Sequence, residues 1–434
     1  MPEITRRQFL IGGGALTACG VGVAAGLSGN RWWEWYPQGP AEVPPVEAAS
    51  PWSIEATYYA SFSSEGSLNC AGCHAAVEEP LPVSYCHIPH TGTYVQCHLC
   101  PHRCVIADGE RGTCRVRENR AGRLFSTVYG NPCAVHVDPI EKKPFYHFLP
   151  TVSAFSLATA GCNLRCLYCQ NWTISQVTEE QTQNEDMPPD VVVRYAQQTQ
   201  SPVIAYTYSE PTAFFEYMLA TARLAREAGL LNVVISAGFI NPDPLRELCT
   251  AVDAIKIDLK GLDEEFYRKV CEAELGPVLE SIRTIYESGI HLEIVNLVVP
   301  TLNDNLEQLQ ALARWVAQDL SPDVPLHFSR FHPEYWLTNL PPTPVERLEQ
   351  AREIALEAGV RFVYIGNVPG HAGNHTYCPR CGQAIIVRQG FGVQEYHLQG
   401  GACAYCGEPI PGLWWPAEPQ GEPVKVLPGL SSDQ

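Results

Sequence analysis

The sequence predicts an α/β fold in which a parallel β-sheet alternates with helices and closes, fully or partly, into a barrel. Three observations predict it. Short apolar runs recur from residue 151 onward, longer segments of helical character separate them, and glycine stands where several of those segments should end. Repeated alternation of strands and helices implies parallel strands joined by right-handed crossovers. A chain of 434 residues can hold such a domain and smaller ones beside it.

The apolar runs are predicted to be buried parallel strands, because strands covered on both faces are apolar throughout. They lie at 153–160, 202–207, 232–237, 253–259, 291–299, 325–331 and 361–366. Helices are predicted between them, at 189–200, 211–228, 276–288, 304–319 and 344–358. Gly229, Gly289 and Gly359 each follow an alanine or serine where a helix should stop, as glycines just past a helix do.

Changes in composition divide the chain into further parts. Tryptophans and prolines without a clear period predict a linker, clustered cysteines predict metal-binding segments, and a final stretch rich in proline and glycine predicts a tail. The predicted parts are a signal (1–30), a linker (31–69), a cysteine-rich region (70–150), the barrel (151–370), a second cysteine-rich segment (371–415) and the tail (416–434).

Charge and cysteine content narrow the classes of function. The formal net charge is −18, so a nucleic-acid partner held by electrostatic attraction is not expected. Most of the 18 cysteines come in C-x2-C pairs, which is the spacing of metal ligands rather than of a disulfide framework.

Cys162, Cys166 and Cys169 form a C-x3-C-x2-C triplet in the run GCNLRCLYCQN, directly after the first apolar run. Cysteine thiolates hold iron–sulfur clusters, and a compact triplet binds three irons of a cubane and leaves the fourth open. Structural zinc is the alternative, but it normally takes four protein ligands, and no fourth Cys or His follows closely. The triplet has the spacing of radical S-adenosylmethionine (SAM) enzymes, at the strand end where barrel enzymes place their sites.

Longer segments make the resemblance more specific. They are QCHLCPHRCVIADGERGTCRVRENRAGRL, VHVDPIEKKPFYHFLP, GCNLRCLYCQNW, TYSEPTAFFEY, DAIKIDLKG, RFHPEY and YIGNVPGHAGNHTYCPRCG, within residues 93–415. On these segments the chain resembles the radical SAM enzyme of the AmmeMemoRadiSam system, a relative of the pyruvate formate-lyase-activating enzymes. The resemblance implies a partial (βα)6 TIM-like barrel with a [4Fe-4S] cluster. The cluster would bind SAM and cleave it reductively to methionine and a 5′-deoxyadenosyl radical, which abstracts hydrogen from a substrate.

The resemblance also implies roles for residues that would contact SAM. Tyr168 matches an aromatic position beside the adenine, and a packed loop aromatic is its plainer interpretation. Ser209 and Glu210 correspond to a Gly-Gly-Glu-Pro segment whose carboxylate receives the methionine ammonium, with Ser209 where Asn is expected. Ser236 ends the next strand, where the family usually shows Asn-Gly, and would contact the ribose.

Two further segments resemble the activating enzymes. Asp258 and Lys260 match their Asp-Leu-Lys segment, which touches SAM, and strand alternation puts both on the same side. A surface ion pair is the alternative. His332 matches a histidine on the SAM side, although a lone histidine is often structural.

Three other groups of cysteines are candidate metal sites. Two knuckles, C-x2-C each and 21 residues apart, have the spacing of a zinc ribbon or of a rubredoxin-like iron site: Cys378, Cys381, Cys403 and Cys406. Zinc is favoured there, since a ribbon needs only structural stapling. A C-x2-C-x3-C-x9-C block precedes the barrel and can hold zinc or an accessory cluster, with a structural site as the default: Cys97, Cys100, Cys104 and Cys114.

Cys70, Cys73 and His74 form a C-x-x-C-H segment that interrupts the family pattern. Haem c attachment is one interpretation of this motif. Zinc is another, because Cys70 and Cys73 are followed by Cys86 and His90 at a suitable spacing. Disulfide pairing in an oxidising compartment is the third.

The start of the chain predicts export. TRRQFL (Thr5–Leu10) precedes an apolar run rich in Gly and Ala that continues to Leu27, as in a twin-arginine signal. Leu16 to Cys19 also resembles a lipobox, which would anchor Cys19 to a membrane. An extracytoplasmic location, with or without a membrane anchor, is therefore expected. A cytoplasmic one follows if the signal does not function.

The predicted function is that of a radical SAM enzyme with an unidentified substrate. Kinship with activating enzymes allows a glycyl-radical protein as substrate, and a small molecule or a protein side chain modified with a Memo-like partner is equally open. A flavodoxin-like or ferredoxin-like donor of low potential is the expected electron source. The alternative is an exported, membrane-associated iron–sulfur or haem redox carrier without SAM catalysis, which export favours because SAM is a cytoplasmic compound.

Overall fold

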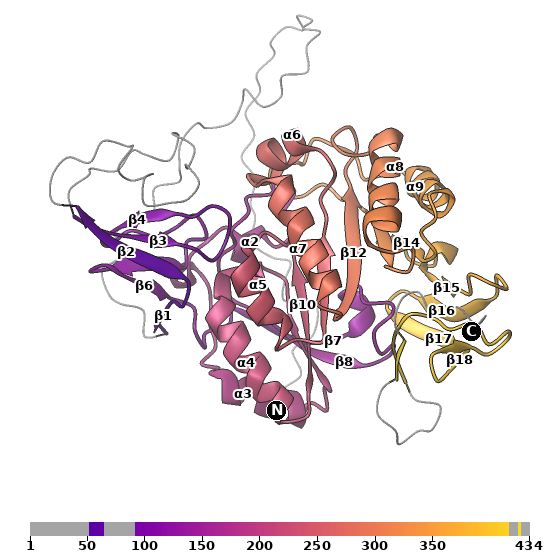
Figure 1. Cartoon of the computed structure of the whole chain (residues 1–434), viewed down its shortest axis with the longest axis horizontal. Coiled ribbons are helices and arrows are strands. Elements are labelled where there is room, and N and C mark those ends of the chain that lie inside the picture. Colours follow the sequence, from indigo (N-terminus) through magenta and orange to yellow (C-terminus); the bar gives the residue numbers. More distant parts are fainter. Residues whose placement is uncertain (1–51, 65–91, 416–423, 427–434) are drawn as a thin grey trace, which may run out of the picture. The chain divides into compact units, whose positions relative to one another are not determined.

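The computed structural model describes residues 52–64, 92–415 and 424–426, all within one compact unit, Val43–Gln434 (Figure 1). The predicted twin-arginine segment, the lipobox at Cys19 and the C-x-x-C-H segment of Cys70, Cys73 and His74 lie outside these residues. Within the described part, no helix is long and apolar enough to cross a membrane.

The central element is an eight-stranded sheet in the order β14-β13-β12-β11-β10-β9-β8-β7, with β14 and β7 at its two edges. Each of the seven predicted apolar runs overlaps one strand, and neighbouring strands among them are parallel: β8 (Ser153–Ala158), β9 (Val203–Tyr206), β10 (Leu231–Ser236), β11 (Ala254–Asp258), β12 (His291–Val298), β13 (Leu326–Arg330) and β14 (Val363–Gly366). Six of these strands, β8 to β13, are each followed by a helix, which is the number of strand–helix units that the resemblance implies, and β14 is a seventh parallel strand. β7 (Ala134–Pro139), which the sequence pattern did not reveal, adds an antiparallel edge to β8.

Helices follow the strands, and all five predicted helices are present (Figure 1). Those that begin or end within a few residues of the predicted bounds are α3 (Pro189–Gln198), α4 (Phe215–Glu227), α7 (Leu275–Glu287), α8 (Leu306–Trp315) and α9 (Val345–Glu357). The helix α5 (Pro242–Cys249) follows β10, and the short α2 (Trp172–Ser175) and α6 (Glu264–Phe266) were not predicted. Gly229, Gly289 and Gly359 have φ of 76°, 73° and 103°, which confirms them as left-handed helix ends.

Two three-stranded antiparallel sheets precede the barrel. One contains β1 (Ile54–Glu55), β6 (Arg123–Ser126) and β5 (Arg117–Arg120), and the other β2 (Tyr59–Ser64), β3 (Gly92–Cys97) and β4 (Val105–Ala107). β1 and β2 correct the linker predicted over 31–69, because its described part pairs in these sheets.

The C-terminal part consists of short strands: β15 (Thr376–Tyr377), β16 (Ala384–Gln389), β17 (Gly392–Tyr396), β18 (Leu398–Gln399), β19 (Ala402–Cys403), β20 (Gly412–Trp414) and β21 (Val424–Val426). β21 lies in the predicted tail and pairs with β20. One buried hydrophobic core contains cysteines of both C-terminal turns together with Tyr146, Tyr364 and Trp414. This core fastens the C-terminal part to the N-terminal ends of the barrel strands, because the backbone N–H groups of Tyr146 and His147 donate to Glu293 near the start of β12.

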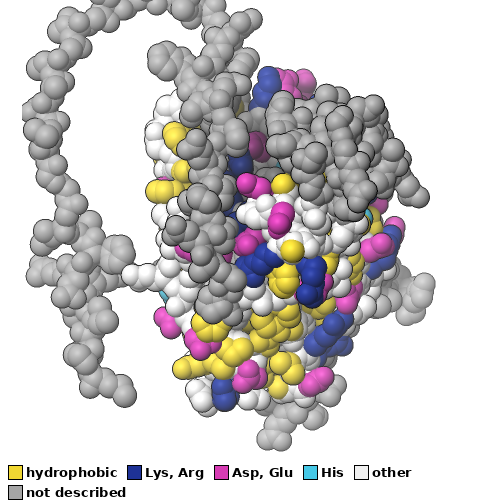
Figure 2. Space-filling model, turned by 90° about the vertical axis from the view of Figure 1, so that its left-hand side faces the viewer, with side chains coloured by type: hydrophobic (Ala, Val, Ile, Leu, Met, Phe, Trp, Pro, Cys, Tyr) yellow, Lys and Arg dark blue, Asp and Glu magenta, His cyan; other side chains and the backbone are white. Residues whose placement is uncertain are grey.

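The surface carries charges of both signs. On the face in Figure 2, acidic and basic side chains are interspersed around a group of hydrophobic ones. This face therefore does not concentrate the negative net charge of the chain in one uniform patch.

Candidate functional site

The triplet lies in the loop between β8 and α2, at the C-terminal end of the first parallel strand. This loop is fixed by the π-helical turn η6 (Tyr267–Cys271), because the N–H of Arg165 donates to the carbonyl of Cys271 (2.9 Å) and that of Leu167 to Val270 (3.0 Å). A segment about 100 positions later in the chain therefore sets the path of the cysteine loop.

The three thiols are suited to bind iron rather than to stand alone. Cys166 is buried, and Cys162 and Cys169 are half-buried. Burial, followed by the charge of Glu210, raises the pKa of Cys162 well above its usual value, and burial raises that of Cys169 to about 11. The thiols would thus stay protonated without a metal, and a bound iron ion would stabilise their thiolates.

Glu210 lies near Cys162 and is held by four hydrogen bonds. Its Oε1 accepts from the Thr212 N–H (3.2 Å), the Thr212 hydroxyl (2.8 Å) and the Ser236 hydroxyl (2.6 Å), and its Oε2 accepts from the Ala237 N–H (2.8 Å). The side chain is buried without an ion-pair partner among the described residues. Two residues predicted separately, Glu210 and Ser236, thus form one unit at the ends of β9 and β10, and a positively charged ligand would complete it.

Ser209 and the residue before it tie this unit to the triplet loop. The Ser209 hydroxyl donates to the carbonyl of Thr159 (2.8 Å), just before the triplet. The Asn171 side chain, just after the triplet, donates to the carbonyl of Tyr208 (2.7 Å), whose φ of 67° is left-handed. Serine thus fills the position where the family pattern has Asn and still makes a hydrogen bond.

Asp258 and Lys260 lie near Cys166, whose pKa they affect. Asp258 pairs with Lys256 and, at 3.3 Å, with Lys260. Burial raises the pKa of Asp258, but the two ammonium groups outweigh it and lower that pKa to about 2. Burial lowers the pKa of Lys260, yet Asp258 and then Cys166 hold it above its usual value. The pair is half-buried rather than a surface ion pair.

Tyr168 is buried against a cysteine that the sequence left without a role. Its hydroxyl lies 3.6 Å from the Cys271 sulfur, and its ring stacks on Phe266 with centroids 6.3 Å apart. Cys271 is itself fully buried and within hydrogen-bonding reach of Cys166. In the sequence, only one feature could have indicated a role for Cys271: it is a cysteine outside any C-x2-C pair that follows the Asp-Leu-Lys segment.

Replacing Cys271 by Ala should leave the triplet cluster able to respond to SAM. Three thiolates are enough to hold a cubane with an open iron, so Cys271 is expected to position the loop and Tyr168 rather than to ligate. The electron paramagnetic resonance signal of the reduced variant should still shift when SAM is added, as in the wild type. Cys249→Ala, at a half-buried cysteine on α5, is the matched control. Loss of the SAM-dependent shift in C271A alone would contradict this role.

His332 is not brought into this group. It is exposed in the segment that follows β13 (Leu326–Arg330). Asn296 on β12 points toward the same end of the sheet, because its Nδ2 donates to the carbonyl of Leu259 (2.9 Å). Its Oδ1 is buried and accepts no hydrogen bond within the described residues.

A second ionic group inside the sheet was missed at the sequence level. Asp138 on β7 pairs with Lys143 (2.6 Å) and Lys142 (2.8 Å) and also accepts a hydrogen bond from the Tyr208 hydroxyl. Burial lowers the pKa of Lys143 to about 8 despite its pairing with Asp138. The string VHVDPIEKKPFYHFLP contains these residues, but only the antiparallel pairing of β7 brings them next to Tyr208.

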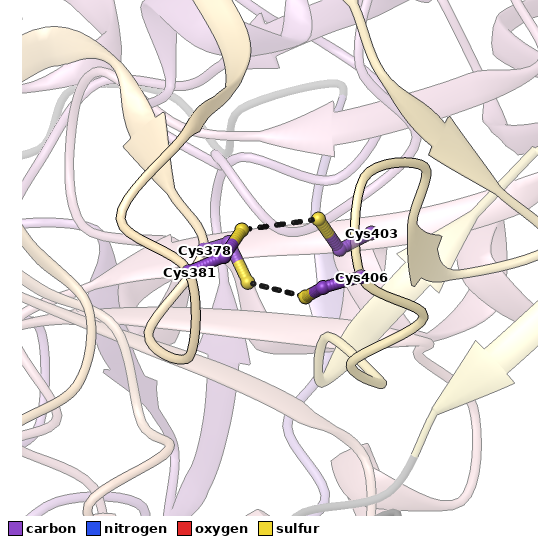
Figure 3. A group of neighbouring side chains, drawn as sticks. All are labelled: Cys378, Cys381, Cys403 and Cys406. Carbon is purple, nitrogen blue, oxygen red and sulfur yellow. Dashed lines mark hydrogen bonds between the residues drawn. The ribbon is translucent and has the colours of Figure 1, made fainter.

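The C-terminal cysteines converge as a four-thiol group (Figure 3). Cys378 lies 3.6 Å from Cys406 and Cys381 lies 3.8 Å from Cys403, measured between sulfurs, and all four sulfurs are within 4.8 Å of one another. A tetrahedral ion with metal–sulfur bonds of about 2.3 Å requires sulfurs about 3.8 Å apart, so these residues fit one metal ion.

The N-terminal cysteines also come together, as the lining of a small cavity. Cys97, Cys100, Cys104 and Cys114 share it with Arg117, and further lining residues are His102, Asn163 and Thr212. Asn163 directly follows Cys162, so this cavity lies behind the triplet loop.

Gly161, at the start of the triplet loop, touches the segment of Cys114. A Cβ there would lie 2.6 Å from the carbonyl oxygen of Cys114 and 2.7 Å from a methyl of Val116, and φ is 91°. Gly161→Ala should therefore lower the free energy of unfolding by about 3 kcal/mol or more, since backbone must move. Urea unfolding measures it.

The matched control is Gly229→Ala, where φ is 76° and nothing lies within 4 Å of the added methyl. That variant should lose only about 1 kcal/mol, from the left-handed conformation alone. Equal losses in the two variants would contradict the close approach.

A hollow of about 1120 Å³ lies at the opposite ends of the strands, bordered by Leu231, His291, Pro325 and Leu413. It is far from the triplet, because these residues stand at or before the N-terminal ends of β10, β12 and β13 or in the C-terminal part. Barrel enzymes place their chemistry at the C-terminal ends, so the triplet and not this hollow is the candidate active site.

Comparisons with known proteins agree with this location. The family model described as the radical SAM superfamily matches residues 156–316, which include the triplet. The uncharacterized protein MJ0808 of Methanocaldococcus jannaschii is 49% identical over 318 residues, 73% of this chain and 95% of that protein. A pyruvate formate-lyase-activating enzyme of Staphylococcus epidermidis is 23% identical over 229 residues, 50% of this chain and 90% of that enzyme.

Among solved structures, a domain of the pyruvate-formate lyase-activating enzyme from Bacteroides vulgatus is matched at 17% identity and a TM-score of 0.34, covering 38% of this chain and 98% of that domain. The link to the AmmeMemoRadiSam system stays a prediction. The chain therefore contains a radical SAM domain, which is homologous to pyruvate formate-lyase-activating enzymes, and it belongs to the same family as MJ0808.

Proposed function

We propose that the protein is a radical SAM enzyme whose [4Fe-4S] cluster is held by Cys162, Cys166 and Cys169. The observation that carries this proposal is the charge pattern around the triplet. Glu210 lies near Cys162, and Lys260 lies near Cys166. The methionine end of SAM carries an ammonium and a carboxylate, so a buried carboxylate and an ammonium near the thiols are complementary to it.

When bound, the cluster supplies the electron that cleaves SAM to methionine and a 5′-deoxyadenosyl radical, which takes a hydrogen atom from the substrate. Glu210 receives the methionine ammonium, because its carboxylate is buried and fixed by four donors. Lys260 receives the methionine carboxylate and is kept charged by Asp258. Tyr168 packs beside the adenine, and Ser236 orients Glu210 and contacts the ribose.

The C-terminal knuckles are proposed to hold a structural zinc ion. Cys378 and Cys403 belong to the core that contains Tyr146 and Trp414, at the N-terminal ends of the barrel strands. An electron relay would have to serve the triplet at the opposite ends, so the position favours stapling over a rubredoxin-like iron.

The substrate is proposed to be a protein, which the similarity to activating enzymes supports. A flavodoxin-like or ferredoxin-like protein is the proposed electron donor, and a Memo-like protein a further partner. The protein is also proposed to be exported through the predicted twin-arginine signal, whose residues lie outside the part of the chain that the structure describes.

The test is the formation of 5′-deoxyadenosine. Full-length protein, reconstituted anaerobically with iron and sulfide, is given dithionite and SAM, and the product is measured by chromatography. The wild type should form it, and the variant C162A/C166A/C169A should form none. A cluster-loaded wild type as silent as the variant would favour the redox carrier without SAM catalysis.

A further inference from the structure

The four N-terminal cysteines enclose a common space. Cys97 and Cys114 are buried, and Cys100 and Cys104 are half-buried. All four line the cavity between β3, β4 and the following turn, together with the aliphatic side chains of Leu99, Ile106 and Ala213 and several polar ones. Four buried or half-buried thiols around one cavity are a donor set suited to a metal centre.

Arg117 lines the same cavity and is only 2% exposed. Its Nη2 donates to Glu216, but its Nε and Nη1 are buried and donate to no acceptor within the described residues. Unpaired buried donors of a guanidinium are costly, and an anionic acceptor in the cavity would satisfy them. The sulfurs of a metal–thiolate centre are such acceptors, and they carry net negative charge.

The spacing of the sulfurs distinguishes a site for a single metal ion from a site for a cluster. The knuckle sulfurs all lie within 4.8 Å of one another, as one tetrahedral ion requires, and they are the one set of three or more potential ligands this close in the part of the chain that the structure describes. The sulfurs of the four N-terminal cysteines are therefore more widely spaced than the knuckle sulfurs, and so are those of the triplet. A cubane needs wider spacing, because each thiolate binds a different iron.

The cavity adjoins the triplet loop through two contacts. Gly161 touches Cys114, and the His102 ring forms a hydrogen bond with the carbonyl of Asn163 at 2.7 Å. A metal centre in the cavity would thus be a near neighbour of the triplet cluster.

We propose that Cys97, Cys100, Cys104 and Cys114 bind a second [4Fe-4S] cluster, whose sulfurs accept hydrogen bonds from Arg117. The inference does not depend on SAM cleavage, because all four ligands and the arginine lie outside the triplet. It also separates the two accessory sites by chemistry: a cluster in the N-terminal block and a single ion in the C-terminal knuckles.

The experiment counts acid-labile sulfide in full-length protein after anaerobic reconstitution with iron and sulfide. Sulfide is decisive because a mononuclear ion at the knuckles brings none. The wild type should contain about eight sulfides per chain, and C162A/C166A/C169A about four, since each cubane holds four. Adding C97S and C100S to that variant should remove the remainder. Cys133→Ser and Cys249→Ser, at half-buried cysteines outside the three sites, are controls that should lose none.

A wild type with about four sulfides and two zinc ions per chain would overturn the proposal in favour of zinc at both accessory sites. Should the triplet variant fail to fold, the wild-type count still decides. A second readout tests Arg117: in the triplet background, the double variant Arg117→Gln and Glu216→Gln should lower the midpoint potential of the remaining cluster, because hydrogen bonds to sulfur raise it. An unchanged potential would show that Arg117 does not face the cluster.

Discussion

Replacing Glu210 by Gln should weaken SAM binding by about 10-fold to 100-fold, because the methionine ammonium loses a charged acceptor worth about 1.5–3 kcal/mol. Equilibrium binding of SAM to the cluster-loaded protein measures the loss. The cluster should remain, since Glu210 touches no iron and Cys162, Cys166 and Cys169 are unchanged.

The glutamine variant also predicts a modest loss of stability. Its amide nitrogen can face the Ser236 hydroxyl but not the Ala237 N–H, and it then leaves the Thr212 donors without an acceptor. The free energy of unfolding should fall by about 1–2 kcal/mol. Glu141→Gln is the matched control, a buried glutamate at the other end of the barrel that accepts from the Thr151 N–H. Unchanged SAM affinity in E210Q would remove Glu210 from the binding site.

The double variant Cys403→Ser and Cys406→Ser should lose about one zinc ion per chain and melt about 10 °C or more below the wild type. A structural site contributes its binding free energy to folding, and each kcal/mol lost lowers the melting temperature of a domain of this size by a few degrees. Differential scanning calorimetry measures the melting temperature, and metal analysis measures the zinc content.

Cys249→Ser provides the comparison for the knuckle variant, since it changes a cysteine without removing a ligand. The absorption of the triplet cluster should persist in the knuckle variant, because the two sites lie at opposite ends of the barrel strands. An unaltered melting temperature, or visible absorption of ferric iron from the purified knuckles, would contradict a structural zinc ion.

Local pattern was enough to predict the barrel strands and their helices. Each buried strand is a continuous apolar run, and left-handed glycines such as Gly229 mark where helices end. The same reasoning missed β7, whose burial is mixed, and β1 and β2, whose partners lie far along the chain. Pairing over such distances leaves little trace in the local sequence.

The site was predictable where chemistry sits in short motifs. The triplet and the knuckles are such motifs, and the structure brings the knuckle cysteines together. The contacts that make a pocket were not predictable, because they join separate strands. Ser236 was predicted to contact the ribose, and the pattern did not indicate that its hydroxyl also donates a hydrogen bond to Glu210. Cys271 had no motif at all, and only the π-helical turn η6 brings it to Tyr168.

Magnetic resonance of the reduced cluster with isotopically labelled SAM tests the proposed site most directly. The triplet should leave one iron open near Glu210 and Lys260, where the methionine carboxylate and the amino group, once it has lost its proton, can bind. Electron–nuclear double resonance should therefore show coupling to nitrogen-15 in the amine and to oxygen-17 in the carboxylate. Absence of both couplings, in protein that holds its cluster and binds SAM, would contradict the account.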